Sequence, residues 1–141
     1  MNNRTFAIIK PDAIKNNYMG KIIDHILKEN FNILSAKLLT MSKVTAEEFY
    51  SIHKDKPFYE ELTKFMSSGK SMVLALEKNN AVKEWRYTIG NTNPDEAENG
   101  TIRNLYATSL WENAVHGSDS DENAKKEIAF FFSNSELIAN N

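Results

Sequence analysis

The sequence contains no cysteine, only five glycines and three prolines among 141 residues, and no long apolar run. The lack of cysteine excludes a disulfide framework, a thiol nucleophile and a cysteine-based zinc site, and we expect a reducing, cytoplasmic setting. No apolar stretch approaches the length that crosses a bilayer, so we expect no membrane partner. The net charge of −2 provides no bulk positive charge, so nucleic acid is not expected as the main partner.

The composition that remains is ordinary for a globular protein. Hydrophobic residues make up 41% of the chain and charged residues 26%, a balance that is not typical of disorder. The length fits one domain of common size, and we find no repeat, low-complexity tract or linker. We therefore predict a single domain over residues 1–141.

Apolar residues recur with the periods of strands and helices in turn. Strands are predicted at Phe6–Ile9, Phe31–Met41, Met72–Leu76 and Ala114–His116. Helices are predicted over residues 18–29, from a capping box at Thr45–Glu48, after Pro57, around Trp85 with its end at Gly90, and around Ile128 after N-cap residues at 118–120.

The order of these elements indicates the fold class. The order β-α-β-α-α-β-α-loop-β-α is that of an α+β, ferredoxin-like split βαβ fold with a four-stranded antiparallel sheet, added helices and a long insertion loop. We expect the helices to cover one face of the sheet. The insertion, Asn91–Arg103, is long enough to be functional. Because this fold hosts many activities, the chemistry has to be sought in particular residues.

Two segments imitate known phosphate and metal sites but lack essential positions. Gly69–Ser71 resembles the end of a Walker A loop, yet Lys64 stands where that loop needs its first glycine. Asp119–Asn123 resembles the start of an EF-hand loop, yet Ala124 and Phe130 replace its glycine and its bidentate glutamate. The three histidines are dispersed without metal-ligand spacing. We predict no metal site made by protein side chains.

His116 is the histidine best placed for chemistry. It ends a strand-like run and precedes Gly117 and the polar segment Ser118–Ser120, so fixed backbone can hold its ring beside open space. A histidine acts as a covalent nucleophile when one ring nitrogen is free and a hydrogen bond orients the other. The alternative is a structural histidine near a turn, and a structural role is what we expect for His25 and His53.

Glu127 and Arg86 each lie at helical spacing from apolar residues of their own helix. A charge beside an apolar stripe either extends outward to solvent or needs a partner. In the second case both side chains line one pocket, where Glu127 orients an imidazole and Arg86 meets an anion. The spacing leaves both interpretations open.

The segment Asn113–Ser120 resembles the N-x-x-H-G-S-D signature of nucleoside diphosphate kinases. Five more segments resemble that family in the same order along the chain, so the likeness covers nearly the whole sequence. They are Thr5–Asp12 with its Lys-Pro-Asp, Tyr50–Phe58 with H-x-x-x-P-F, Gly90–Pro94 with G-x-T-N-P, Gly100–Arg103 with G-T-I-R, and the closing helix at Glu127–Phe132.

The resemblance implies Mg2+-dependent, ping-pong transfer of the γ-phosphate from a nucleoside triphosphate such as ATP to a nucleoside diphosphate, which maintains NTP and dNTP pools. It implies that His116 carries the phosphate, that Glu127 and Ser118 fix it, and that Lys10 and Tyr50 complete the catalytic set. The nucleotide-binding positions that it implies are Lys10, Phe58, Arg86, Thr92, Arg103, Leu110 and Asn113.

The family also indicates partners. They are nucleoside di- and triphosphates (ATP, GTP, ADP, GDP and the deoxy forms), with Mg2+ carried by the nucleotide phosphates. Phe58 would stack on the base, opposite Leu110, so we expect broad base specificity. Members assemble as homo-oligomers, either hexamers or tetramers, and the sequence does not choose between them.

The sequence departs from the common family pattern at a few places. Asn104–Tyr106 replaces G-D-F and Trp111-Glu112 replaces G-R, which affects subunit contacts and base preference. Two alternatives to the enzyme are a catalytically reduced nucleotide-binding regulatory domain and a phosphocarrier. Loss of Lys10 or of the histidine would favour the first, and the second would not need Phe58. We therefore predict the kinase.

Overall fold

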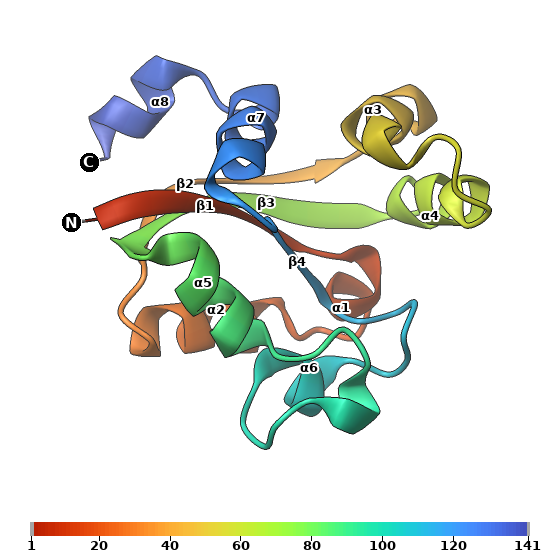
Figure 1. Ribbon diagram of the computed structural model, residues 1–141, viewed down its shortest axis with the longest axis horizontal. Helices are drawn as coiled ribbons and strands as arrows, with labels where there is room; N and C mark the ends of the chain where they lie inside the picture. Colours follow the sequence, from red (N-terminus) through yellow and green to blue (C-terminus); the bar gives the residue numbers. More distant parts are fainter. Residues whose placement is uncertain (1, 141) are drawn as a thin grey trace.

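The centre of the molecule is one four-stranded antiparallel sheet with the order β2-β3-β1-β4 (Figure 1). This structure is a computed structural model, and it describes residues 2–140. The predicted α+β fold is confirmed. The strands are β1 (Asn2–Ile9), β2 (Asn32–Thr40), β3 (Lys70–Asn79) and β4 (Val115–Gly117).

Every predicted helix is present, and the structure adds three short ones that the sequence analysis did not predict: α1, α6 and α8. The helices are α1 (Pro11–Lys15), α2 (Met19–Lys28), α3 (Lys43–Phe49), α4 (Tyr59–Met66), α5 (Ala81–Ile89), α6 (Ile102–Tyr106), α7 (Asp121–Phe131) and α8 (Asn134–Ala139), with 3-10 turns η1 (Ser51–His53) and η2 (Pro94–Glu96).

β1 and β3 are longer than predicted, and the expected starts of two helical segments were wrong. α3 starts before the predicted capping box, because the side chain of Ser42 is the N-cap and accepts a hydrogen bond from the Thr45 amide at 3.0 Å. The insertion loop does not run unstructured to Arg103. Thr101 caps α6 through the Asn104 amide, so Arg103 stands on a helix. In both places a hydroxyl N-cap precedes a short helix.

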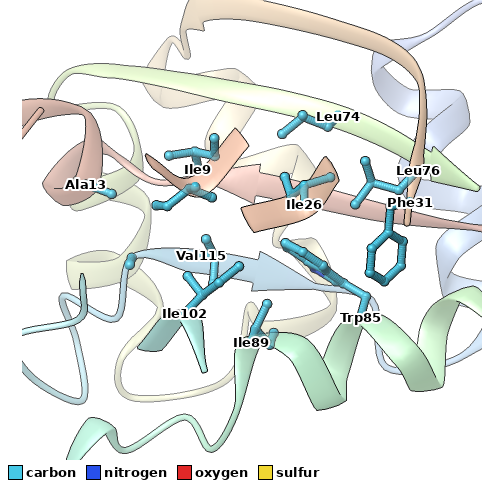
Figure 2. Packing of buried hydrophobic residues seen from close by; sticks show 13 residues of the cluster. Ile9, Ala13, Ile26, Phe31, Leu74, Leu76, Trp85, Ile89, Ile102 and Val115 are labelled. Atoms are coloured by element: carbon cyan, nitrogen blue, oxygen red, sulfur yellow. The ribbon is translucent and has the colours of Figure 1, made fainter. Parts of the chain in front are cut away.

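The prediction that helices cover one face of the sheet was wrong. α2, α5 and α6 lie on one side, and α3, α4, α7 and α8 lie on the other (Figure 1). One apolar cluster includes Ala7, Ile9 and Trp85 (Figure 2), and the other includes Phe6 and Ile8. All four of these β1 residues are at most 1% exposed. Their unbroken apolar run is typical of a strand buried on both faces, which was the available signal.

Pairing of β1 with β4 sets the position of the site. Ile8 pairs with His116 and Ile9 with Val115, so the residues that follow β1 meet those that precede β4. The Lys10 amide donates to the Ala114 carbonyl at 2.8 Å, which extends this contact by one step.

Among residues 2–140, no helix has the length and apolar character needed to span a membrane.

Replacing Gly117 by alanine should destabilise the fold. An added Cβ would lie 2.8 Å from Trp85 Cδ1 and 3.1 Å from Ile89 Cδ1, inside a packed core. Such overpacking costs about 1–3 kcal/mol, which a lower urea midpoint would report. Gly20→Ala is the matched control, since nothing lies within 4 Å of its Cβ position. Equal midpoints for Gly117→Ala and the wild type would contradict this packing argument.

Candidate active site

His116 is held at the edge of the sheet by both its backbone and its ring. Besides the pairing with Ile8, its carbonyl accepts a hydrogen bond from Trp85 Nε1 at 3.1 Å. The rings of Phe6, Phe49 and Tyr50 surround the imidazole, with centroids 5.7 to 6.3 Å away in edge-on orientations. The ring therefore has a fixed orientation in largely apolar surroundings.

Glu127 on α7 reaches the imidazole. Its Oε1 lies 2.8 Å from His116 Nε2, and the Ser118 hydroxyl donates to the same oxygen at 2.8 Å. Of the two interpretations, the structure shows Glu127 on the imidazole, but Glu127 and Arg86 line different hollows and not one common pocket. An ionised carboxylate only accepts hydrogen bonds, so Nε2 carries the ring hydrogen and Nδ1 keeps its lone pair. No residue between 2 and 140 forms a hydrogen bond with Nδ1.

The side chain that carries the free Nδ1 nitrogen is partly exposed to solvent. The His116 side chain is 18% exposed and that of Glu127 20%. Both border a hollow of about 580 Å³, which Phe49, His53 and Phe130 also line. A small reactant can therefore approach the imidazole from solvent.

Burial lowers the pKa of His116 below its ordinary value of 6.5, because desolvation disfavours the imidazolium. The hydrogen bond and charge of Glu127 act in the opposite direction, while Lys10 and Arg103 reinforce the lowering. At neutral pH the ring is consequently uncharged, the state in which a histidine nitrogen can act as a nucleophile.

Lys10 and Asn113 meet close to this histidine. Lys10 Nζ donates to Asn113 Oδ1 at 3.0 Å, and both residues are buried, at 8% and 5% exposure. Burial, followed by the charge of Arg103, lowers the pKa of Lys10 to about 8, and the nearby Asp12 opposes this. Lys10 is a buried cation bound to a neutral amide, so it can gain from an incoming anion.

Arg103 is bound to the protein's own backbone, which the sequence did not predict. Its Nε, Nη1 and Nη2 donate to the carbonyls of Asn113, Gly90 and Val115 at 3.3, 3.0 and 2.9 Å. Burial, and then the charge of Arg86, lowers the pKa of Arg103 to about 10, so it remains a cation at neutral pH. Arg103 thus joins the end of α5 to the strand that carries the histidine. Two of its five N–H groups remain for another acceptor.

Arg86 and Thr92 are exposed and line a hollow of about 850 Å³ together with Arg103. The structure thus brings these three predicted phosphate-binding residues together around one open space. The hydrogen bond from Asn123 is the main cause that lowers the pKa of Asp119, and the charge of Arg86 makes a smaller contribution in the same direction. Its outward position leaves the guanidinium available to a soluble anion.

Phe58 and Leu110 line neither of these two hollows. Phe58 borders an apolar hollow of about 710 Å³, together with Leu62 of α4 and Trp111. Leu110 is 49% exposed, and its carbonyl accepts a hydrogen bond from Asn113 Nδ2 at 3.0 Å. Asn113 therefore connects the Lys10 side of the site to this apolar side.

The Tyr50 hydroxyl is buried and has no hydrogen-bond partner among the residues that the structure describes. Burial, and then the charge of Glu127, raises the pKa of Tyr50 above its ordinary value of 10, so the hydroxyl stays protonated. A buried donor without a partner is costly, and a bound acceptor oxygen would relieve that cost.

Two supporting residues were missed by the sequence analysis. Ala114 has a φ of +72°, a conformation that is strained for a residue with a side chain. The Ala114 amide donates a hydrogen bond to Asp12 Oδ2 at 3.0 Å, and burial raises the pKa of Asp12. The Lys-Pro-Asp motif contained Asp12, but only the β1–β4 pairing reveals its partner. This contact fixes the turn that leads into His116.

The model of the family described as nucleoside diphosphate kinase matches residues 3–137 of this chain. The chain belongs to the nucleoside diphosphate kinase family. Relatives of that name from Persephonella marina and Chloroherpeton thalassium are 50% and 53% identical to it over 135 and 137 residues. The alignments cover 96% of both proteins in the first pair and 97% of both in the second.

Solved structures of nucleoside diphosphate kinases share the fold. The Aquifex aeolicus protein has a TM-score of 0.95 and 40% identity, and the match covers 97% of this chain and 99% of that one. The Halobacterium salinarum protein, in complex with CDP, has a TM-score of 0.91 and 32% identity, covering 97% and 91%. The family suggested by the sequence resemblance is confirmed.

Titration of the His116 imidazole by NMR should give a midpoint below 6.5, and the midpoint should fall further in Glu127→Gln, which loses the carboxylate that raises the pKa. The unfolded chain binds this proton more readily than the folded chain. Folding stability is therefore fully present above 6.5 and decreases as pH falls through the lower folded-state pKa.

His116→Gln serves as the control for this titration, because it removes the signal and so assigns it among the three histidines. A wild-type midpoint above 6.5, or a midpoint that Glu127→Gln leaves unchanged, would contradict the electrostatics described for this ring.

Proposed function

We propose that this nucleoside diphosphate kinase transfers the γ-phosphate of a nucleoside triphosphate to a nucleoside diphosphate through a phosphohistidine on His116. The observation that carries the proposal is the orientation of the imidazole. Glu127 holds Nε2 at 2.8 Å while Nδ1 has no partner among residues 2–140. A neutral ring with one nitrogen fixed and the other free is what covalent catalysis by histidine requires.

In the first half-reaction, the lone pair of Nδ1 attacks the γ-phosphorus. The N–P bond forms as the bond to the bridging oxygen breaks, and the nucleoside diphosphate leaves with that oxygen and its electron pair. In the second, a β-phosphate oxygen of another diphosphate attacks, the N–P bond breaks and Nδ1 regains its lone pair. The hydrogen stays on Nε2 and keeps its hydrogen bond to Glu127 throughout, so the ring neither gains nor loses a proton.

The cations of the site suit a transfer in which charge spreads over the equatorial phosphate oxygens. Lys10 and Arg103 are buried near the ring, and Arg86 and Thr92 line the open hollow beside Arg103. We assign to these residues, together with Asn113, the binding of the phosphates and ribose. The unpartnered Tyr50 hydroxyl would donate to a phosphate oxygen, and Ser118 would support Glu127 from behind.

We propose that Mg2+ enters with the nucleotide, held by its phosphate oxygens rather than by a protein site. Within residues 2–140, no group of three or more His, Asp or Glu side chains could hold a metal ion. The cation would neutralise charge on the transferring phosphates. The residues present fit a metal that is bound by the nucleotide, because the charged side chains that we assign to the phosphates are cations, which bind phosphate oxygens and not metal ions.

The substrates we infer are the nucleoside di- and triphosphates, with the base between Phe58 and Leu110. We propose that residues 1–141 form one domain and act in the cytoplasm as a homo-oligomer, a hexamer or a tetramer. In the described part of the chain β2 is a free sheet edge. Leu38 on β2 is 48% exposed and Leu27 on α2 is 53% exposed, which supports self-association.

Incubation with ATP and Mg2+, followed by removal of nucleotide, should leave one acid-labile phosphate per chain. Addition of GDP should release this phosphate as GTP, because the same site serves donor and acceptor. His116→Ala should carry no label, whereas His25→Ala, which changes a histidine outside the site, should label like the wild type.

Two outcomes would overturn this proposal. A His116→Ala protein that still takes up and passes on phosphate would show that the nucleophile is another residue. A wild-type protein that binds ATP but never labels would favour the regulatory nucleotide-binding domain.

A further inference from the structure

Trp111 is an exposed aromatic residue that the packing of the fold does not explain. It is 59% exposed and lies beside Leu110, which is 49% exposed. Its one ring contact in the described chain is with Phe58, at a centroid distance of 6.0 Å and an interplanar angle of 48°. Exposed apolar surface that is continuous with a hollow, as the Trp111 ring is with Phe58, is typical of a ligand-binding groove.

The backbone around Trp111 is ordered by hydrogen bonds on both sides. The Glu112 amide donates to the Ser109 hydroxyl at 3.0 Å, and Asn113 Nδ2 donates to the Leu110 carbonyl at 3.0 Å. Through its other amide atom, Asn113 accepts from Lys10 Nζ. The turn that presents Trp111 is thus fixed relative to the cationic end of the site.

The Phe58–Trp111 pair forms an open corner. Both rings line the 710 Å³ hollow, and Leu62 and Phe65 of α4 complete its apolar lining. Because the rings are inclined at 48°, a flat ligand stacked on one ring is tilted by a similar angle relative to the other. Glu61 is the one charged side chain that lines this hollow, so base-edge contacts are few.

We propose that Trp111 is a specificity-determining residue of the base subsite, which makes with Phe58 an aromatic corner that favours purine over pyrimidine nucleotides. The proposal rests on the function proposed above. The fused rings of a purine are wide enough to contact Phe58 and Trp111 together, whereas a pyrimidine reaches only one of them. Phe58 alone would bind all bases with similar affinity, whereas with Trp111 the affinity increases with the size of the base.

Calorimetric affinities for GDP and CDP test this directly. Loss of part of one aromatic–base contact corresponds to about a fivefold change in affinity. Trp111→Thr should weaken GDP binding by about that factor and leave CDP binding nearly unchanged, while Trp111→Phe should keep most of the purine preference. Ile138→Thr, at a 61% exposed apolar position on α8, is the matched control and should change neither affinity.

Fluorescence gives a second readout. Trp85 is fully buried and Trp111 is exposed, so GDP should quench the exposed emission in the wild type and have no such effect in Trp111→Phe. Equal loss of GDP and CDP affinity in Trp111→Thr, no loss of either, or no quenching by GDP would overturn the proposal.

Failure of this proposal is distinguishable from failure of the proposed function. Diphosphates bind without donating a phosphoryl group, so these affinities do not depend on phosphorylation of His116. A protein that labels on His116 but shows no purine preference would refute only the role of Trp111. A protein that prefers GDP through Trp111 but never labels would refute only the proposed transfer reaction.

Discussion

The contact between His116 Nε2 and Glu127 Oε1 fixes the direction in which the free Nδ1 nitrogen points. A ring on a strand at the sheet edge could rotate, and either nitrogen could then face the solvent. Glu127 holds one nitrogen at 2.8 Å and is itself held by Ser118 at the same distance. The aromatic rings of Phe6 and Phe49 limit the remaining rotation. The cations and the Tyr50 hydroxyl can act on a phosphate only if Nδ1 points toward that phosphate.

The β1–β4 pairing makes a positive site from a chain whose net charge is −2. It places Lys10, at the end of β1, near the turn before β4, while Arg103 on α6 joins that turn to Gly90 through backbone carbonyls. Neither cation forms an ion pair with a carboxylate between residues 2 and 140. Unpaired buried cations are costly in the free protein. A triphosphate would offset that cost, so the same desolvation that lowers the pKa of Lys10 would strengthen the proposed phosphate binding.

Much of this arrangement could be predicted from local patterns. Helical spacing placed Glu127 beside the apolar stripe of its helix, although it did not decide between an inward and an outward side chain. The position of His116 at the end of a strand-like run predicted a ring held by fixed backbone beside open space. The helices on both faces were missed because the pattern of each helix shows that it has a buried side but not which side of the sheet it covers. The contact of Asp12 with the strained Ala114 spans 102 positions and depends on the pairing of β1 with β4. The hydrogen bonds from Arg103 to backbone carbonyls span 10 to 13 positions, and they depend on how α6 packs against β4 and the end of α5. No local spacing carries that information.

The most direct test of this account is the position of the phosphate on the imidazole. Phosphorus NMR of the phosphorylated protein, or analysis of phosphohistidine after alkaline digestion, distinguishes the two ring nitrogens. We expect phosphate on Nδ1 of His116, because Glu127 is hydrogen-bonded to Nε2. Phosphate on Nε2, or on a side chain other than His116, would contradict it.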